Sequence, residues 1–305
     1  MKRFNNRKVV LTLTLLIGSL FTLFGCGGGG GGSVTPGAAG TGMISGTAVK
    51  GPVNSGTMVA YAVNNGIKGV ELASTMTDTQ GNFSMNIDNY TGPIMLLMSG
   101  GTYTDEATGS VMTMGMNDVM TALIPMMSSN ATVTGVQVTP LTSMAQAMAG
   151  AMASGMTTTN CETANTAVGH YFMVNDILHT MPMNPLVAGS GATATQDMRN
   201  YGMAIAAMTQ YAQTLGMPDS SGMVTAMMND AADGTMNGMM GNTQVTMGGG
   251  MSMMGGGTAM QSTAGTSGLA NAMTTFMGSA MNKSGLMAAD MQALISQMST
   301  TNGTI

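Results

Sequence analysis

The sequence contains no tryptophan, two histidines, two cysteines and few charged residues. Charged side chains make up 7% of the chain, where about 25% is usual for a globular domain. There is no His-Glu-x-x-His zinc motif, no nucleophile elbow before a histidine and no cysteine pair for zinc or haem. The adjacent Asp105 and Glu106 are expected in a solvated turn. We therefore predict that the protein is not an enzyme.

The first 25 residues have the pattern of an export signal. Four basic residues precede an uncharged, mostly apolar run of 15 residues, 9–23. This run is shorter than the roughly 20 apolar residues that a membrane-spanning helix needs. Leu23-Phe24-Gly25-Cys26 then resembles the lipobox of bacterial lipoproteins. The alternative is an uncleaved N-terminal anchor with a free thiol.

The lipobox resemblance implies a location and an attachment. In that family the cysteine becomes the mature N-terminus and carries acyl chains such as palmitate, so Cys26 is the expected lipid attachment site. Gly27 stands where inner-membrane lipoproteins of enteric bacteria carry aspartate. By analogy, we expect an outer-membrane lipoprotein, on the periplasmic face or the cell surface, attached to the membrane through its N-terminal lipid.

Removal of the signal changes the charge balance. Four of the eight basic residues leave with residues 1–25 and none of the 13 acidic ones do, so the net charge falls from −5 to −9. Nucleic-acid binding requires clustered Lys and Arg, and electrostatic docking on anionic lipid requires a basic patch. The composition argues against both kinds of partner, and it identifies no protein partner in the envelope.

The second cysteine, Cys161, has no partner once Cys26 carries lipid. No intramolecular disulfide is therefore expected, although an exported protein meets an oxidising compartment. Free cysteines are usually buried, so we expect Cys161 to be an inert core residue. The alternative is a reactive thiol.

Composition divides the mature chain into three parts. Residues 26–42 include six consecutive glycines and form a flexible tether, because such a stretch cannot bury a core. In residues 43–139, short apolar runs alternate with turn residues, and Phe83, Met85 and Ile87 alternate with polar residues. This period of two predicts an antiparallel β-sandwich. Further strands are expected at 58–63, 94–98, 111–116 and 132–138.

Parts of this region resemble a known module. Residues 44–53, 59–61 and 75–83, including the turn Thr77-Asp-Thr-Gln-Gly-Asn-Phe83, resemble the carboxypeptidase regulatory-like module. This is a small prealbumin-like β-sandwich of bacterial surface proteins, and the resemblance covers about residues 43–105. The module is non-catalytic where its role is understood. The resemblance therefore implies a fold and no activity.

At Thr139-Pro140 the apolar period changes to that of a helix. Thr139 can cap a helix and Pro140 suits its first turn, and Leu141, Met144, Met148 and Met152 then fall on one helical face. Further helices are expected at 164–178, 195–215, 222–232, 269–282 and 286–298. The predicted fold is α+β and multidomain, with an all-α domain over residues 140–305. That domain contains a low-complexity loop near 234–262.

The most unusual feature is the number of methionines, 41 in the chain. Met is a good helix former that fills irregular core gaps. Most of the periodic Met positions are explained by core packing. Thioethers are also soft ligands that select Cu(I) or Ag(I) over harder ions, and exposed Met can scavenge oxidants as sulfoxide.

Two places are not explained by periodicity. His179, Met181 and Met183 lie near prolines 182 and 185, which oppose helix continuation, so we expect an exposed loop. The alternative for His179 is a helix-end cap. The second place is a Gly-rich stretch within 49 uncharged residues, 234–282, and its alternative is a disordered loop. Its candidate ligands, expected to be solvent-accessible, are Met236, Met239, Met240, Met247, Met251, Met253 and Met254.

The sequence thus predicts a non-enzymatic, lipid-anchored envelope protein. Its most concrete predicted activity is binding of Cu(I) or Ag(I) through these Met residues and His179, and no other cofactor is expected. The alternative functions are a structural or adhesive surface protein in which Met is only core material, and a Met-based oxidant scavenger.

Overall fold

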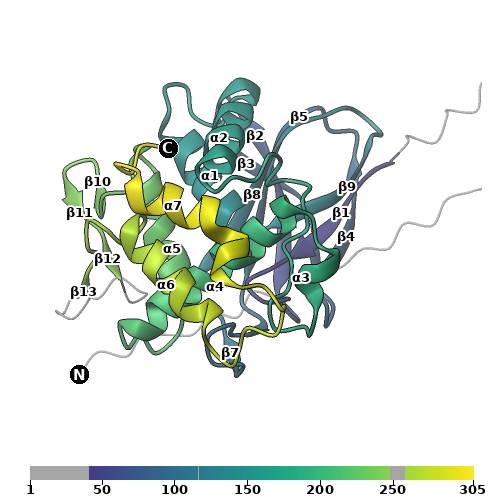
Figure 1. Ribbon diagram of the computed structural model, residues 1–305. Coiled ribbons are helices and arrows are strands. Elements are labelled where there is room, and N and C mark those ends of the chain that lie inside the picture. The colour runs from purple at the N-terminus through teal and green to yellow at the C-terminus, as the bar shows by residue number, and fades with distance from the viewer. Residues whose placement is uncertain (1–40, 116, 248–257) are drawn as a thin grey trace, which may run out of the picture. The chain divides into compact units, whose positions relative to one another are not determined.

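The computed structural model describes residues 41–115, 117–247 and 258–305. Strands come first along the chain and most helices follow, with four two-residue strands between α5 and α6 (Figure 1). The prediction of an α+β fold is confirmed at this level. The predicted export signal, Cys26 and most of the predicted tether (26–42) lie outside the described residues, whereas the last two tether residues, Thr41 and Gly42, belong to β1. No helix in the described ranges is long and apolar enough to cross a membrane.

The strands range from two to ten residues in length. Their bounds are β1 (Thr41–Ala48), β2 (Thr57–Asn64), β3 (Ile67–Met76), β4 (Asn82–Asp88), β5 (Gly92–Ser99), β6 (Thr102–Thr104), β7 (Val111–Thr113), β8 (Val119–Met127), β9 (Thr132–Val138), β10 (Met239–Met240), β11 (Thr243–Gln244), β12 (Thr246–Met247) and β13 (Thr258–Ala259). The helices are α1 (Pro140–Ala151), α2 (Thr158–Tyr171), α3 (Ser190–Thr193), α4 (Gln196–Thr214), α5 (Ser221–Ala231), α6 (Ser267–Met277), the 3₁₀ helix η1 (Ala288–Met291) and α7 (Gln292–Thr300).

Two sheets contain the longer strands. The first has the order β3-β2-β5-β8 and is antiparallel throughout. The second has the order β4-β1-β9, and its β1–β9 pair is parallel, with a register shift between Ile44 and Gly46. A Cβ at Gly46 would collide with the carbonyl oxygen of Val136, so the close approach of the two strands requires glycine there.

Side chains from both sheets meet in one hydrophobic cluster. Ile44 and Phe83 from the three-stranded sheet are buried with Met58, Leu96 and Met120 from the four-stranded one. The opposite face of the four-stranded sheet contributes to a second cluster. There Val63, Met95 and Leu123 are buried together with residues of the helices. This sheet is therefore covered on both faces.

The start of the helical part follows its sequence signal. Thr139 Oγ1 accepts a hydrogen bond from Thr142 N at 3.2 Å, and Thr142 Oγ1 accepts one from Thr139 N at 2.8 Å, which forms a capping box with Pro140 in the first turn. Helix α1 packs against β8, α2 and α5, and α6 packs against α4 and α7 (Figure 1). The predicted cap and the predicted helix start are confirmed.

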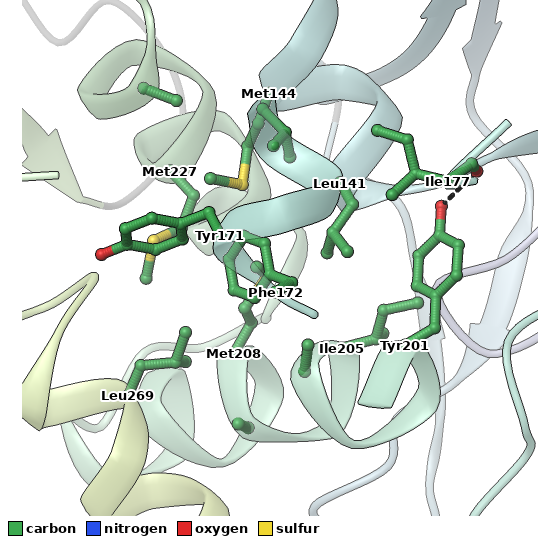
Figure 2. Packing of buried hydrophobic residues seen from close by; sticks show 14 of the residues in the cluster. Leu141, Met144, Tyr171, Phe172, Ile177, Tyr201, Ile205, Met208, Met227 and Leu269 are labelled. Atoms are coloured by element: carbon green, nitrogen blue, oxygen red, sulfur yellow. Dashed lines mark hydrogen bonds between the residues drawn. The ribbon is translucent and has the colours of Figure 1, made fainter. Parts of the chain in front are cut away.

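The helical core mixes aromatic, aliphatic and methionine side chains. Figure 2 shows Leu141, Met144, Phe172, Ile205 and Met208 in the cluster that the helices enclose. At its edge the hydroxyl of Tyr201 donates to Ile177 O at 2.9 Å (Figure 2) and lies 2.6 Å from Thr139 Oγ1. The only strongly polar atom of this large side chain is thereby satisfied, as burial requires.

Several predicted boundaries were wrong. Helix α2 begins at Thr158, six residues before its predicted start, because the side chain of Thr157 caps it. It ends at Tyr171, and Met173 then adopts a left-handed backbone conformation (φ 54°). The last helix begins only at Gln292 and not at the predicted residue 286, so Met287 precedes it and is 69% exposed.

Candidate functional site

A buried cluster of polar side chains joins the strands to the helices. Its centre is Lys50, which follows β1 and is fully buried. Lys50 Nζ donates to Thr209 Oγ1 of α4 and to Ser220 Oγ before α5, both at 2.7 Å. It also lies 3.4 Å from Glu106 Oε2 and 4.7 Å from the centre of the Tyr103 ring.

Two adjacent carboxylates complete this cluster. Glu106 Oε1 accepts from Gly51 N at 2.6 Å, and Ser220 Oγ donates to Asp105 Oδ2, also at 2.6 Å. Asp105 and Glu106 are 4% and 3% exposed, so the expectation of a solvated turn was wrong. The turn is buried because Lys50 and the hydroxyls of Thr209 and Ser220 satisfy both acids.

A third buried carboxylate repeats this arrangement at α5. Asp118, which precedes β8, accepts hydrogen bonds from Ser221 Oγ at 2.5 Å and from Thr225 Oγ1 at 2.7 Å. Ser221 Oγ also accepts from Gly115 N at 3.1 Å. Ser220 and Ser221 together thus connect the N-terminus of α5 to two loops of the strand region.

The hydrogen bonds of this cluster suit a structural role better than a catalytic one. A serine becomes a nucleophile when a neighbouring base takes its proton. Here Lys50 donates to Ser220, and Ser220 is 4% exposed and donates to a carboxylate that also accepts from Thr108 N and Oγ1 at 3.0 Å. The cluster therefore holds two parts of the fold together.

A cavity of about 200 Å³ lies next to the cluster and is partly open to solvent. One wall comes from the end of β1 and the turn after it, and the other from residues 181–185 and helix α4. Glu106 belongs to its lining, so the cavity adjoins the Lys50 cluster. The apolar lining residues are Val49, Pro52, Met181, Pro182, Met183, Pro185 and Ile205.

The first predicted metal site is divided between two cavities. Met181 and Met183 line the cavity just described, whereas His179 lines another, with Asp176. His179 Nδ1 lies 2.9 Å from Asp176 Oδ2. His179 and Met181 are exposed as predicted, but Met183 is 4% exposed, because its segment is fixed to α4 by the bond from Met183 N to Met198 O. The predicted exposure of this loop therefore holds only for its first part.

The second predicted site is largely inside the protein. Met236 is fully buried and Met247 is 3% exposed, so the expectation that these side chains reach solvent was wrong. Met239 is half-buried and Met240 is 45% exposed. Met251, Met253 and Met254 lie outside the described residues. Among the residues that the structure describes, no three His, Cys, Asp or Glu side chains form a group that could hold a metal ion.

Asp230 explains why this Gly-rich segment is ordered where it leaves α5. Its Oδ1 accepts backbone hydrogen bonds from Asn237, Gly238 and Met239 at 3.0, 2.6 and 3.1 Å. Its Oδ2 is buried without a partner among the described residues. Burial raises the pKa of Asp230 from 3.8 to about 6, against the opposing effect of the three backbone bonds.

The prediction for Cys161 is confirmed. Its side chain is fully buried in α2, and burial, with a smaller contribution from the charge of Glu162, raises the pKa of the thiol to about 12. The thiolate is the reactive form of cysteine, so this environment makes the residue inert.

Comparisons with known proteins assign no family. No family model matches the chain, and no curated protein matches its sequence. Among solved structures, a 9R-lipoxygenase from Cyanothece PCC8801 is similar at 10% identity with a TM-score of 0.23. The match covers 67% of this chain and spans 26% of the lipoxygenase chain. A similarity at this level carries no argument about fold or activity.

Proposed function

We propose that the protein is a non-enzymatic lipoprotein of the outer membrane in which methionine serves as core material. In this proposal a carboxypeptidase regulatory-like, prealbumin-like β-sandwich (43–139) follows the tether and a helical part (140–305) follows the sandwich. The shared cluster of the two sheets and the helix start at Pro140 support that division. The described residues nevertheless form one compact unit, and the second cluster draws on both parts.

One observation carries the proposed role of methionine. In the described ranges, 21 methionines are buried within the two hydrophobic clusters, where Leu or Ile would otherwise stand. A thioether enclosed by apolar side chains cannot take up an ion without opening the core. The flexible side chain instead fills irregular gaps. Methionine as packing material therefore accounts for most of the enrichment.

The second candidate function is soft-metal binding at residues 181–183. It is favoured by the fact that Met181 and Met183 line one cavity and that Met181 is 51% exposed. Thioethers there would bind Cu(I) or Ag(I). Two sulfur atoms with no third soft ligand from His179 make a weaker site than the sequence predicts.

A Cu(I) titration separates the two candidates. If methionine is only core material, wild type and Met181→Leu will show the same weak, unsaturable uptake in isothermal titration. If the metal site exists, wild type will bind one ion saturably and Met181→Leu will lose this binding, because leucine keeps the apolar volume but has no sulfur. Met287→Leu, at a 69% exposed position elsewhere, is the matched control and is expected to behave as wild type.

The proposed anchor predicts both a modification and a location. Mass spectrometry of the N-terminal peptide is expected to find acyl chains on Cys26, and the protein should fractionate with the outer membrane. A Cys26→Ser variant is expected to leave the outer-membrane fraction, because the acyl chains that would hold the protein in that bilayer are attached to this residue. An unmodified Cys26 in wild type, or an unchanged location of the variant, would contradict the proposal.

A further inference from the structure

The cavity next to Glu106 has the features of a small-molecule binding site. The packing of the surrounding elements does not require an open space there. Ligand pockets are concave, mainly apolar and contain a few fixed polar groups. Seven lining residues here are apolar. Three of these are prolines, which restrict the backbone of the lining on both walls. A volume of about 200 Å³ is below the roughly 300–1,000 Å³ of drug-sized pockets, so its occupant is small.

The charges around the cavity define what it can accept. Glu106 is the only acidic lining residue, and its partner Lys50 is already bound to two hydroxyls. The other polar lining side chains are Thr47, Gln80, Asn82 and Asn184, which carry no charge. An anion would meet the Glu106 carboxylate without a free cation among the lining residues. An uncharged molecule needs no such compensation.

Glu106 also offers one specific interaction. A carboxylate has about four acceptor positions. Among the described residues, Oε2 accepts from Lys50 and Thr209, and Oε1 accepts from Gly51 N alone. Oε1 therefore retains an acceptor position for a single N–H or O–H group of a ligand. This bond would orient an otherwise apolar molecule in the cavity.

We propose that this cavity binds a small, uncharged, mainly apolar molecule with one hydrogen-bond donor, of the phenol or indole class. The site brings together residues 49–52, 106, 181–185 and 205, which lie far apart in the sequence. It depends neither on the lipid anchor nor on metal binding, and its occupant would contact Met181 as an apolar wall. The sulfur of that residue is not required.

Indole is a suitable probe because the chain contains no tryptophan. Excitation at wavelengths longer than the tyrosine absorption band then excites indole alone. The emission of indole shifts to shorter wavelengths when it leaves water. The experiment uses the mature chain, residues 26–305, with Cys26→Ser to avoid partitioning into lipid or detergent. We expect a saturable shift with one indole bound per chain. A linear, unsaturable response would overturn the proposal.

Three variants locate the binding. Val49→Phe, which fills the cavity, and Met181→Asp, which places a charge on its wall, are each expected to weaken binding by about tenfold or more. Met181 is half exposed, so its substitution does not endanger folding and the test survives if Val49→Phe fails to fold. Val70→Phe, at a 69% exposed position on β3, is the matched control and should bind as wild type. Equal affinity of Met181→Asp and wild type, or equal weakening in Val70→Phe, would show that indole does not bind here.

Discussion

Replacement of Lys50 by methionine is expected to lower the free energy of unfolding by about 3–5 kcal/mol. Methionine has a similar length and matches the neighbouring core in chemistry, so little packing is lost. The cost arises because Glu106 and Asp105 remain buried without the one cation that lies near them among the described residues, and the hydroxyls of Thr209 and Ser220 lose their donor. Chemical denaturation followed by circular dichroism measures this change.

Lys68 provides the matched control for Lys50. Its Nζ lies 4.4 Å from the centre of the Tyr61 ring, which parallels the position of Lys50 over Tyr103, but Lys68 is exposed. Lys68→Met is therefore expected to cost no more than about 1 kcal/mol, the usual value of an exposed cation–π contact.

A double variant tests the assigned cause. If the unpaired acid is responsible, adding Glu106→Gln to Lys50→Met should recover part of the loss, and the two changes should not be additive. Equal destabilisation by Lys50→Met and Lys68→Met would contradict the assignment of the cluster as the connection between strands and helices.

Asp230 is expected to make the protein less stable as the pH rises. Its pKa is raised from 3.8 to about 6 by burial, so the folded state prefers the protonated form. The corresponding stabilisation is complete below pH 3.8 and is lost as the pH rises through about 6. The shift corresponds to about 3 kcal/mol of linked stability.

Asp230→Asn removes this titration while it keeps an oxygen for the three backbone N–H groups. Replacing the buried acid by an amide adds an offset to the unfolding free energy, and that offset does not change with pH. The difference in unfolding free energy between Asp230→Asn and wild type is therefore expected to move in favour of the variant by about 2 kcal/mol between pH 4 and pH 8, most of the full linkage. Asp88→Asn, at an exposed position in β4, is the control and should show no such trend. A difference that stays constant with pH would contradict the assigned titration.

The sequence predicted the elements whose signals are local. The alternation at Phe83, Met85 and Ile87 became β4 with these side chains buried, and the helix expected at 195–215 became α4, Gln196–Thr214. Strand β8 (Val119–Met127) was not predicted, because it contains Pro125, and proline argues against assignment of a segment as an interior strand.

The Lys50 cluster could not be predicted from local pattern. Lys50 is separated from Glu106, Thr209 and Ser220 by 56, 159 and 170 residues, so nothing in the neighbourhood of any one of them indicates the others. The scarcity of basic residues was the one feature of the sequence that could have pointed to this cluster. With only four basic residues outside the predicted signal, a lysine between apolar strand residues and Gly51-Pro52 stands out as a candidate for a buried pair.

The Gly-rich segment was misjudged for a different reason. Its composition predicts solvent exposure, since glycine lowers the gain from ordering a chain. Asp230 overrides this expectation near the start of the segment by holding three successive amide groups, and Met236 is then buried against Gly265 and its neighbours. The carboxylate of Asp230, close by in the sequence, thus orders the start of this segment despite its glycine-rich composition.

The parallel pairing of β1 with β9 bears on how this protein folds if it is exported as proposed. The first strand of the fold lies in the middle of its sheet, and one of its two neighbours begins only at Thr132. That sheet cannot be completed until roughly the first half of the chain is available for folding. Contacts of such sequence separation slow folding, because a long loop must close before they form. The topology thus delays completion of the sheet, which would suit the proposed export, since a translocated polypeptide must remain unfolded.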